Sequence, residues 1–554
     1  MINQVHSSAG VYTAVEDYSI QATPLAASVV GMCGMARRGK INERVPVRGA
    51  DDLVNIFGKR DPKYGPGLYL AEPITEQTNT FTFVRLVNKA KYAVAVMTVD
   101  DHTAATPLIR LSSYVDSFGE LVGVENLDEL GFLPGDVTND NVIGYFLLEN
   151  PGDWNNEYAV AVRPNAPRGL DAKQDRNLYD CKQFNVDLFQ NYVAGSTPSQ
   201  TVTVTMANHV DEFNRQYQID LALESESNDL RFMPNPYFVH DLDFVTSDFT
   251  YFQGGSDGER VTSTQIAKAY SEYFGDPEEV RVTILVNGWY DDYIIHRGMA
   301  AAASNHINCH CIGSIPSDMQ TVNKAIRYRK QILNLNNRNM SLYTSDIKVF
   351  DEHTGRKIWV PCTGQVAAAY CLTDNERGSW FAPAGIRASR FLKILAVRVK
   401  YDQDDRDALT REQINYIRKL PNAGYAIWEA STLYNFNSAF QMVPIQRMVG
   451  YILETCAHTA KASVFDPNDD QLRMYLKSII ETFLEDIKLR RGLRSIGDSE
   501  GYVVVCDERN NTSQTIANGD LVIDLILDPT RYTKRIIYRF NINPKGSRVT
   551  DIVA

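Results

Sequence analysis

The stretch Tyr502-Val-Val-Val-Cys506-Asp507 opens a run of three predicted β-strands near the C-terminal end of the chain. Leu521 to Leu527 and Arg535 to Ile542 are the other two, and the third alternates cleanly between two faces. Aspartates among the apolar residues of the second strand indicate that one face of the sheet is partly wet. These strands predict a small sheet that other molecules complete.

A comparable strand, Gly10 to Glu16, lies near the other terminus, with no second strand close by in the sequence. Because unpaired backbone groups must be satisfied somewhere, an isolated extended arm needs the edge of a partner sheet. Terminal strands of this kind join chains by strand addition. We therefore predict inter-subunit strand exchange through Val11, Tyr12, Thr13, Val15, Val504, Ile523, Ile536, Ile537, Tyr538 and Phe540.

The composition is that of an ordinary globular protein, and 554 residues leave room for roughly two to four domains. The formal net charge of -12 argues against binding to nucleic acid or anionic membranes, which require a basic face. We expect no secretory signal and no membrane insertion, since no apolar run approaches roughly 20 residues. The eight cysteines form no disulfide framework, which favours a reducing cytosol.

The middle of the chain alternates between helical and extended patterns. Thr264 to Phe274 and Tyr293 to His306 have helical spacing, and each is followed by a buried apolar strand, at Val280 to Val286 and Ile307 to Ile312. This rhythm predicts a mostly parallel sheet with helices packed on it. Between about residues 101 and 230, short strands separated by Asn, Asp, Gly and Pro predict a β-rich insertion.

Two amphipathic helices are predicted before the terminal strands, at Pro444 to Ala460 and Asp470 to Arg490. We expect them to cover one face of the terminal sheet. In the second helix the predicted apolar stripe consists of Leu472, Tyr475, Leu476, Ile479, Phe483 and Ile487.

The segment Gly254-Gly-Ser256-Asp-Gly258 matches the G-x-S-x-G pattern of a hydrolase nucleophile elbow. In that elbow the helix begins at the serine, whereas Glu259 to Thr262 here separate the serine from the predicted helix. We interpret the segment as a glycine-rich turn. A cytosolic serine hydrolase that uses Ser256 is the remote alternative.

The segment Cys309-His310-Cys311, with His306 and His296 upstream, contains residue types that bind zinc. In a strand, however, the two thiols share one face while His310 points to the other, and no second cysteine pair follows. Buried thiols in a core are the preferred interpretation.

The segment Asp466-Pro-Asn-Asp-Asp470 begins like a calcium loop, but Gln471 and Lys477 replace the required Gly and Glu. A helix N-cap explains it better. With no Walker loop or dinucleotide fingerprint, we expect no enzyme, no catalytic residue, no metal and no cofactor.

Short motifs in a fixed order run along most of the chain. They are Ser8 to Tyr12, Gly31 to Gly39, Phe57-Gly58, Phe83 to Arg85, Pro151 to Glu157, Leu242 to Gly258, Val360-Pro361, Thr373-Asp374 with Gly378 and Trp380, Ala382 to Gly385, Leu409 with Gln413 to Asn415, Trp428 to Thr432, Phe465 to Asn468, and Val505 to Asp507 with Asn510, Asn511 and Gly519. In this order they resemble the tail sheath protein family of contractile-tailed bacteriophages. The residues that depart from the family pattern are Ala9, Asn155, Glu429 and Ser431.

The resemblance implies an α/β and α+β multidomain fold. Residues 1–22 would be an N-terminal arm, 23–100 with 231–430 a discontinuous middle α/β domain, and 101–230 an outward β-rich insertion domain. Residues 431–540 would form an inner α+β domain whose sheet is completed by the arms of neighbouring subunits. Residues 541–554 would be the C-terminal arm.

The resemblance also implies a function without catalysis. The subunit would polymerise with itself, as a helical homo-oligomer of stacked six-fold rings, around an inner tail tube protein. It would also contact baseplate and tail terminator proteins. Contraction from an extended metastable lattice would drive the tube through the host envelope. We expect assembly in the host cytoplasm and a final place in the contractile tail of a virion. A sheath of a phage-derived contractile injection particle is the alternative.

Overall fold

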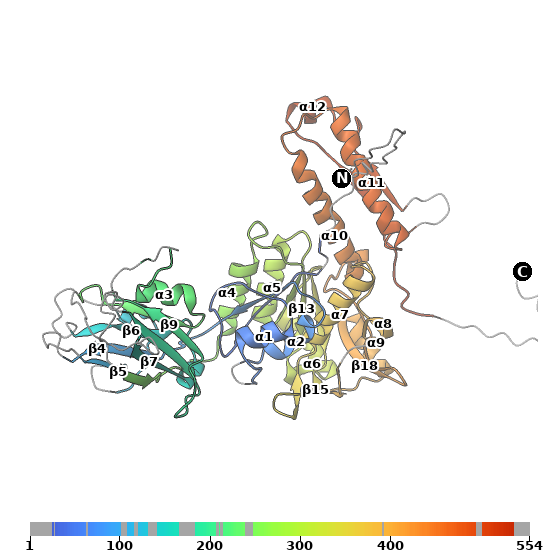
Figure 1. Ribbon diagram of the computed structural model, residues 1–554. Helices are drawn as coiled ribbons and strands as arrows, with labels where there is room; N and C mark the ends of the chain where they lie inside the picture. Colours follow the sequence, from blue (N-terminus) through green and yellow to red (C-terminus); the bar gives the residue numbers. More distant parts are fainter. Residues whose placement is uncertain are drawn as a thin grey trace, which may run out of the picture.

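The computed structural model of the chain describes residues 25–26, 28–62, 65–100, 108–115, 120–130, 141–165, 183–206, 210, 214–238, 248–389, 393–494 and 501–536. Over these ranges the fold is mixed α/β, with several separate sheets. Figure 1 shows a β-rich part, a central body of helices around a sheet, and a projecting helix pair. The predicted strand Gly10 to Glu16 lies outside the described ranges. Of the predicted strand Arg535 to Ile542 only the first two residues are described, and they lie in no strand.

The central body is built on an eight-stranded sheet of order β19-β18-β14-β13-β12-β1-β3-β2. The strands from β18 to β3 in this order run parallel to their neighbours, whereas the edge strands β19 and β2 are antiparallel. The predicted parallel sheet is thus confirmed. Its strands are β1 (Val30–Gly34), β2 (Val45–Val47), β3 (Phe81–Arg85), β12 (Ile284–Val286), β13 (His310–Ser314), β14 (Met340–Thr344), β18 (Ile414–Leu420) and β19 (Gly424–Ile427).

Helices cover both faces of this sheet and bury two hydrophobic clusters against it. On one face pack α1 (Ala50–Phe57), α2 (Leu68–Thr75) and α7 (Thr363–Glu376). On the other pack α4 (Ser263–Phe274), α5 (Tyr293–Asn305), α6 (Val322–Arg327) with the π-helical turn Tyr328–Leu333, and α9 (Gln403–Arg411). The short helix α8 (Gly385–Ser389) lies beside β19, and a three-stranded sheet joins β15 (Ile347–Asp351), β16 (Arg356–Val360) and β17 (Ala396–Val397).

Local signals set the ends of these helices. At the start of α4, Thr262 and Gln265 form a reciprocal capping box. The carboxylate of Asp292 caps α5 by accepting from the Ile294 amide at 2.9 Å. Helix α1 ends at Gly58, whose φ of 81° lies in the left-handed region that favours glycine. The predicted helices at Thr264 to Phe274 and Tyr293 to His306 are confirmed to within a residue.

The β-rich part holds two four-stranded sheets, of order β10-β6-β4-β5 and β11-β7-β8-β9, which enclose a shared core. Helix α3 (Ile219–Glu226) contacts β9 and β10. Strands β4 and β11 lie outside the range 101–230 in which the sequence indicated a β-rich insertion. The strands are β4 (Val94–Val99), β5 (Ile109–Ser113), β6 (Val142–Leu148), β7 (Tyr158–Pro164), β8 (Phe184–Gln190), β9 (Gln200–Val204), β10 (Leu230–Pro234) and β11 (Asp248–Tyr251).

Two crossing segments connect the β-rich part to the central body. Lys91 and Ser256 exchange backbone hydrogen bonds of 2.8 and 3.1 Å between these segments. The fully buried Arg85, at the end of β3, donates to the Pro151 carbonyl of the β-rich part at 2.9 Å. Burial lowers the pKa of Arg85 to about 10, so its guanidinium stays charged near neutral pH. The joint is thus held by backbone pairing and one buried cation.

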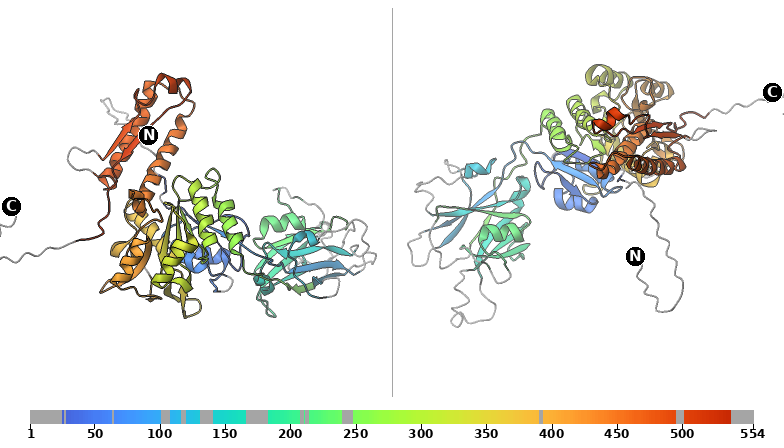
Figure 2. Two further views of the ribbon diagram at one scale, coloured as in Figure 1. Left: turned by 180° about the vertical axis from the view of Figure 1, so that it is seen from behind. Right: turned by 90° about the horizontal axis from the view of Figure 1, so that it is seen from above.

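The helix pair consists of α10 (Val443–Ala460) and α11 (Asp470–Leu489), and it projects from the central body (Figures 1 and 2). Both helices lie where the sequence predicted them. The predicted stripe on α11 is partly wrong, because Tyr475 is 43% exposed. Packing against α10 and the small sheet selects a rotated face, whose buried residues are Arg473, Leu476, Ile479, Ile480, Leu484 and Ile487.

Candidate assembly site

A two-stranded antiparallel sheet of β20 (Tyr502–Val505) and β21 (Asp524–Leu527) packs on the helix pair. Its register pairs Val503 with Ile526 and Val504 with Leu525. The strand predicted at Leu521 to Leu527 therefore forms, but begins three residues later. Between β20 and β21 the chain makes a turn and the short helix α12 (Ser513–Ala517).

The two faces of this sheet have different surroundings. Val504 is buried against the helices with Met448, Ile452 and Leu484, and Leu525 packs on the same cluster. On the opposite face the cross-strand pair Val503 and Ile526 is 50% and 61% exposed. An exposed pair of β-branched side chains on a strand ladder is an apolar surface suited to a further protein layer.

The edges of the sheet are its second distinctive feature. Among the described residues the sheet has only these two strands, so each strand has one edge with no strand beside it. Open edges present rows of backbone donors and acceptors that template the addition of another strand. The geometry therefore offers two positions for strand addition.

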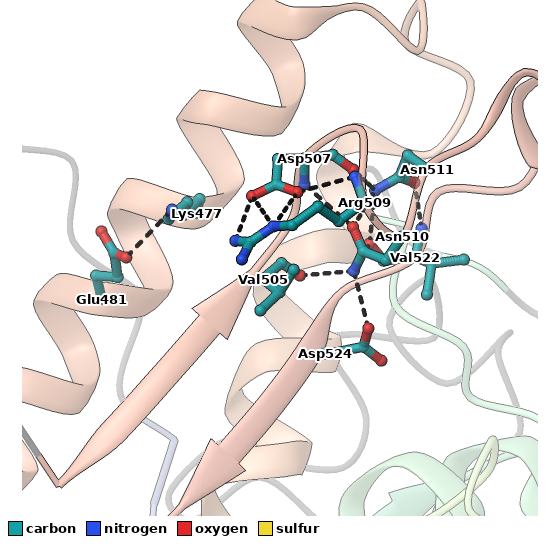
Figure 3. A network of polar contacts seen from close by, with 9 residues as sticks. All are labelled: Lys477, Glu481, Val505, Asp507, Arg509, Asn510, Asn511, Val522 and Asp524. Carbon is teal, nitrogen blue, oxygen red and sulfur yellow. Dashed lines mark hydrogen bonds and ion pairs between the residues drawn. The ribbon is translucent and has the colours of Figure 1, made fainter.

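Side-chain amides close the long connection between the two strands (Figure 3). Asn511 accepts from the Val522 amide at 2.8 Å and donates to the Val522 carbonyl at 2.9 Å, as a neighbouring strand would. Asn510 donates to the Val505 carbonyl at 2.8 Å and to the Asp524 carboxylate at 3.0 Å. These bonds hold the ends of β20 and β21 together although 18 residues separate the strands in the sequence.

Charged groups fasten β20 to its turn and to α11. Arg509 donates to both carboxylate oxygens of Asp507 and lowers the pKa of Asp507 to about 2. The hydroxyl of Tyr502 donates to Glu485 at 3.1 Å, and Lys488 lies 3.0 Å from the same carboxylate. The bond from Lys488 is the main cause of the lowered pKa of Glu485.

The chain after β21 turns back to the central body. Pro529 forms an antiparallel β-bridge with Leu493. The hydroxyl of Tyr532 then donates to the buried carboxylate of Glu429 at 3.2 Å. Lys534 pairs with the same carboxylate at 2.8 Å. Burial raises the pKa of Tyr532, which stays protonated as a donor. The chain is thereby anchored on the body as far as Lys534.

Three of the residues predicted for strand exchange lie in the described ranges. Val504 and Ile523 point toward the helix pair, so they offer a neighbour only their backbone, whereas Ile536 is 73% exposed. Sequence reasoning missed Val503, Ile526 and the amide of Asn511. The other predicted residues lie outside the described ranges, namely Val11, Tyr12, Thr13, Val15, Ile537, Tyr538 and Phe540.

In the described part of the chain the residues of the alternative catalytic and metal sites have structural partners. Ser256 lies in the crossing segment, where its hydroxyl accepts from the Gly258 amide at 3.1 Å. His296, His306 and His310 bond separately to Tyr328, Phe274 and Ser341. Within the described ranges no group of three His, Cys, Asp or Glu residues is placed to hold a metal ion. Asp469 caps α11, as predicted for the calcium-like segment.

The described part of the chain also contains no helix that is both long and apolar enough to cross a membrane.

The fold of the chain is similar to that of solved sheath tail proteins. The solved sheath tail protein of Listeria innocua matches with a TM-score of 0.55 at 10% identity, covering 92% of this chain and 96% of that chain. The sheath tail protein of Desulfitobacterium hafniense gives 0.53 at 11% identity, covering 90% and 94%. At these identities the likeness concerns the fold alone.

Curated relatives agree with this class. The tail sheath protein of Enterobacteria phage T4 is 21% identical over 316 residues, which are 53% of this chain and 47% of the relative. That of Vibrio phage KVP40 is 26% identical over 204 residues, 37% of this chain and 30% of the relative. The chain thus spans about half or less of the relatives' length in these matches. No protein-family model matches. In sequence the chain is thus similar to tail sheath proteins of contractile phages, and in fold it is similar to solved sheath tail proteins.

Proposed function

We propose that the chain is a subunit of a contractile sheath that polymerises around an inner tail tube and shortens to drive the tube through a host envelope. The observation that carries the proposal is the two-stranded sheet with two open edges and an exposed apolar face. The similarity to phage tail sheath proteins supports it. The serine hydrolase alternative has no support, since Ser256 serves the joint to the β-rich part.

In this proposal residues 431–540 form the inner domain, and the central sheet with its helices forms the middle domain. The β-rich part faces outward and is bounded by the crossing segments at Lys91 and Ser256. Baseplate and tail terminator proteins contact the ends of a six-fold helical lattice in a virion tail. Assembly takes place in the host cytoplasm.

The arms Gly10 to Glu16 and Arg535 to Ile542 of neighbouring subunits add to the open edges of β20 and β21. Two added strands make about six to ten main-chain bonds at about 0.5 to 1.5 kcal/mol net each. Bonds of this total strength persist while weaker polar contacts between subunits repack. Contraction is then a switch between two packings of subunits that remain joined.

Deletion of residues 1–19 tests the proposal. The shortened chain is expected to fold, with an unchanged circular dichroism spectrum, and to form no tubes in electron micrographs. Deletion of residues 1–8 is the matched control, because it leaves the predicted strand intact and is expected to permit tubes. Normal striated tubes from the chain that lacks residues 1–19 would contradict strand addition by this arm.

A further inference from the structure

A polar cleft of about 770 Å³ lies where the chain leaves the two-stranded sheet for the central body. Four segments line it: the π-helical turn and its end at 329–334, the end of α9 with the following turn at 410–413, the linker 431–442 before α10, and residues 531–534 after β21. It therefore sits between the central body and the segment that follows β21. We call it the basic cleft, after the cations that line it, Arg329, Lys330, Arg411, Arg531 and Lys534.

The cleft has an excess of positive charge in a chain of net charge -12. Lys330 pairs with Glu412 at 2.7 Å, and Lys534 pairs with Glu429. Among the described residues no carboxylate lies within ion-pair distance of the other three cations, Arg329, Arg411 and Arg531. Three guanidinium groups therefore line the cleft without an ion pair, and the carboxylate in the lining, Glu412, already pairs with Lys330.

Arg329 shows that the cleft is built and not a chance gathering of surface charge. It is only 4% exposed, and its acceptors are neutral, among them the carbonyls of Leu335 at 2.7 Å and Leu433 at 3.0 Å. Its Nε has no hydrogen-bond partner in the described part of the chain. Burial lowers the pKa of Arg329, and Glu412, which already pairs with Lys330, offsets this only in part. A further carboxylate in the cleft would reduce the remaining cost of burying the cation. Arginine binds carboxylates especially well because its planar fork matches their geometry.

We infer that the basic cleft receives Glu16 and Asp17 from the N-terminal arm of a second copy of this chain. The inference rests on the proposed function and names which arm lies beside β21. Glu16 is the last residue of the predicted strand Gly10 to Glu16, and Asp17 follows it directly. If the arm strand adds parallel to β21, Glu16 and Asp17 lie at its C-terminal end. They then lie beside Arg531 and Lys534, which follow the C-terminal end of β21.

The charge of the other arm excludes it from this position. Residues 537–554 carry the cations Arg539, Lys545 and Arg548 against the single side-chain carboxylate of Asp551. The cleft would repel such a segment and attract the acidic one, which is how charge patterns select partners. The C-terminal arm therefore adds at the edge of β20.

Charge reversal on either side of the contact, and then on both sides, tests the inference in the full-length chain. The cleft variant Arg411→Glu/Arg531→Glu and the arm variant Glu16→Lys/Asp17→Lys are each expected to raise the critical concentration for tube formation about tenfold or more. The chain that carries all four substitutions is expected to recover assembly. Lys40→Glu/Lys89→Glu is the control, because it changes the net charge equally at exposed sites of the central body.

Each result separates the inference from the proposed function. If the chain without residues 1–19 still forms tubes, strand addition by this arm, as proposed above, is wrong, and the inference falls with it. If that deletion blocks tubes but the cleft variant assembles like the control, only the inference is wrong. If both double variants lose tube formation and the combined chain does not recover it, the cleft binds another acidic segment. The choice of the N-terminal arm would then be wrong.

A binding measurement covers the case of a misfolded variant. A labelled peptide of residues 8–22 is expected to bind the wild-type chain at least tenfold more tightly than the same peptide with Glu16→Lys/Asp17→Lys. Equal binding of the two peptides would contradict the inference.

Discussion

The eight-stranded and the two-stranded sheets differ in how their faces are covered. The larger sheet has helices on both faces, and its antiparallel edge strands β19 and β2 flank a parallel interior. The smaller sheet has helices on one face, and among the described residues both of its strands are edge strands. Natural proteins usually blunt such edges with charges or a covering segment. Here Val503 and Ile526 are instead apolar and exposed, which is expected where another chain completes the sheet.

The two sheets are tied together through one buried ion pair. Arg447 of α10 donates to both oxygens of Asp374 of α7, at 2.8 and 2.5 Å, and both side chains are almost completely buried. Its guanidinium also lies 4.9 Å from the centre of the Tyr370 ring. The helix that supports the small sheet is thereby locked to a helix that covers the large one.

Replacement of Arg447 by methionine is expected to have the largest effect on the fold. It leaves the buried carboxylate of Asp374 without its cation, which costs about 3 to 5 kcal/mol of unfolding free energy. Urea denaturation followed by circular dichroism measures this loss and shows whether the two sheets then unfold in separate transitions. Arg490→Met is the control, because its pair with Asp486 is exposed and is worth less than about 1 kcal/mol. Equal losses in both variants would contradict the coupling role of Arg447.

Acid is expected to weaken the large sheet before the small one. Burial lowers the pKa of His296 to about 4 and that of His310 to about 3, and both residues belong to the central body. In the unfolded chain these histidines bind protons near pH 6.5, so stability is lost as the pH falls below that value. Each contributes up to about 1.4 kcal/mol per pH unit.

The variant His310→Asn isolates one of these contributions. Its stability is expected to fall less steeply than that of the wild type between pH 6 and pH 4, as measured by thermal unfolding. Burial raises the pKa of Asp291 to about 6, which favours the folded state on acidification, but this acts equally in both proteins. The exposed His458 offers the matched substitution His458→Asn, which is expected to leave the slope unchanged. Parallel curves for wild type and His310→Asn would refute the assignment.

Local sequence signals predicted much of the fold. The helices α4, α5, α10 and α11 and the parallel sheet follow from hydrophobic periodicity and end signals, which act over a few residues. The buried face of α11 was less predictable, because Met474 and Tyr475 extend the apolar stripe around the helix. Only contact with α10 and the small sheet selects the face that becomes buried.

The candidate site was less accessible to sequence reasoning than the fold. Alternation along the strands shows that Val503 and Val504 lie on opposite faces of the sheet, and that Ile526 lies on the face opposite to its neighbours in β21. It does not show which of the two faces packs on the helix pair. The bonds between Asn511 and Val522 join residues that only the turn and α12 bring together. The division between body and insertion was also hidden, because β4 is as apolar as a strand of the central sheet.

Polar replacement of the exposed pair is expected to have the smallest effect on folding and a clear effect on assembly. In Val503→Thr/Ile526→Thr both side chains keep β-branched shapes on a solvent-facing ladder, so the unfolding free energy is expected to change by less than about 0.5 kcal/mol. A partner that covers this face loses apolar contact, so tubes should form only at higher protein concentration, as measured by sedimentation. Val193→Thr is the control, because this side chain is 70% exposed in the β-rich part, far from the small sheet. A double variant that assembles like this control would show that the face stays in solvent, and that only the edges of the small sheet meet a neighbour.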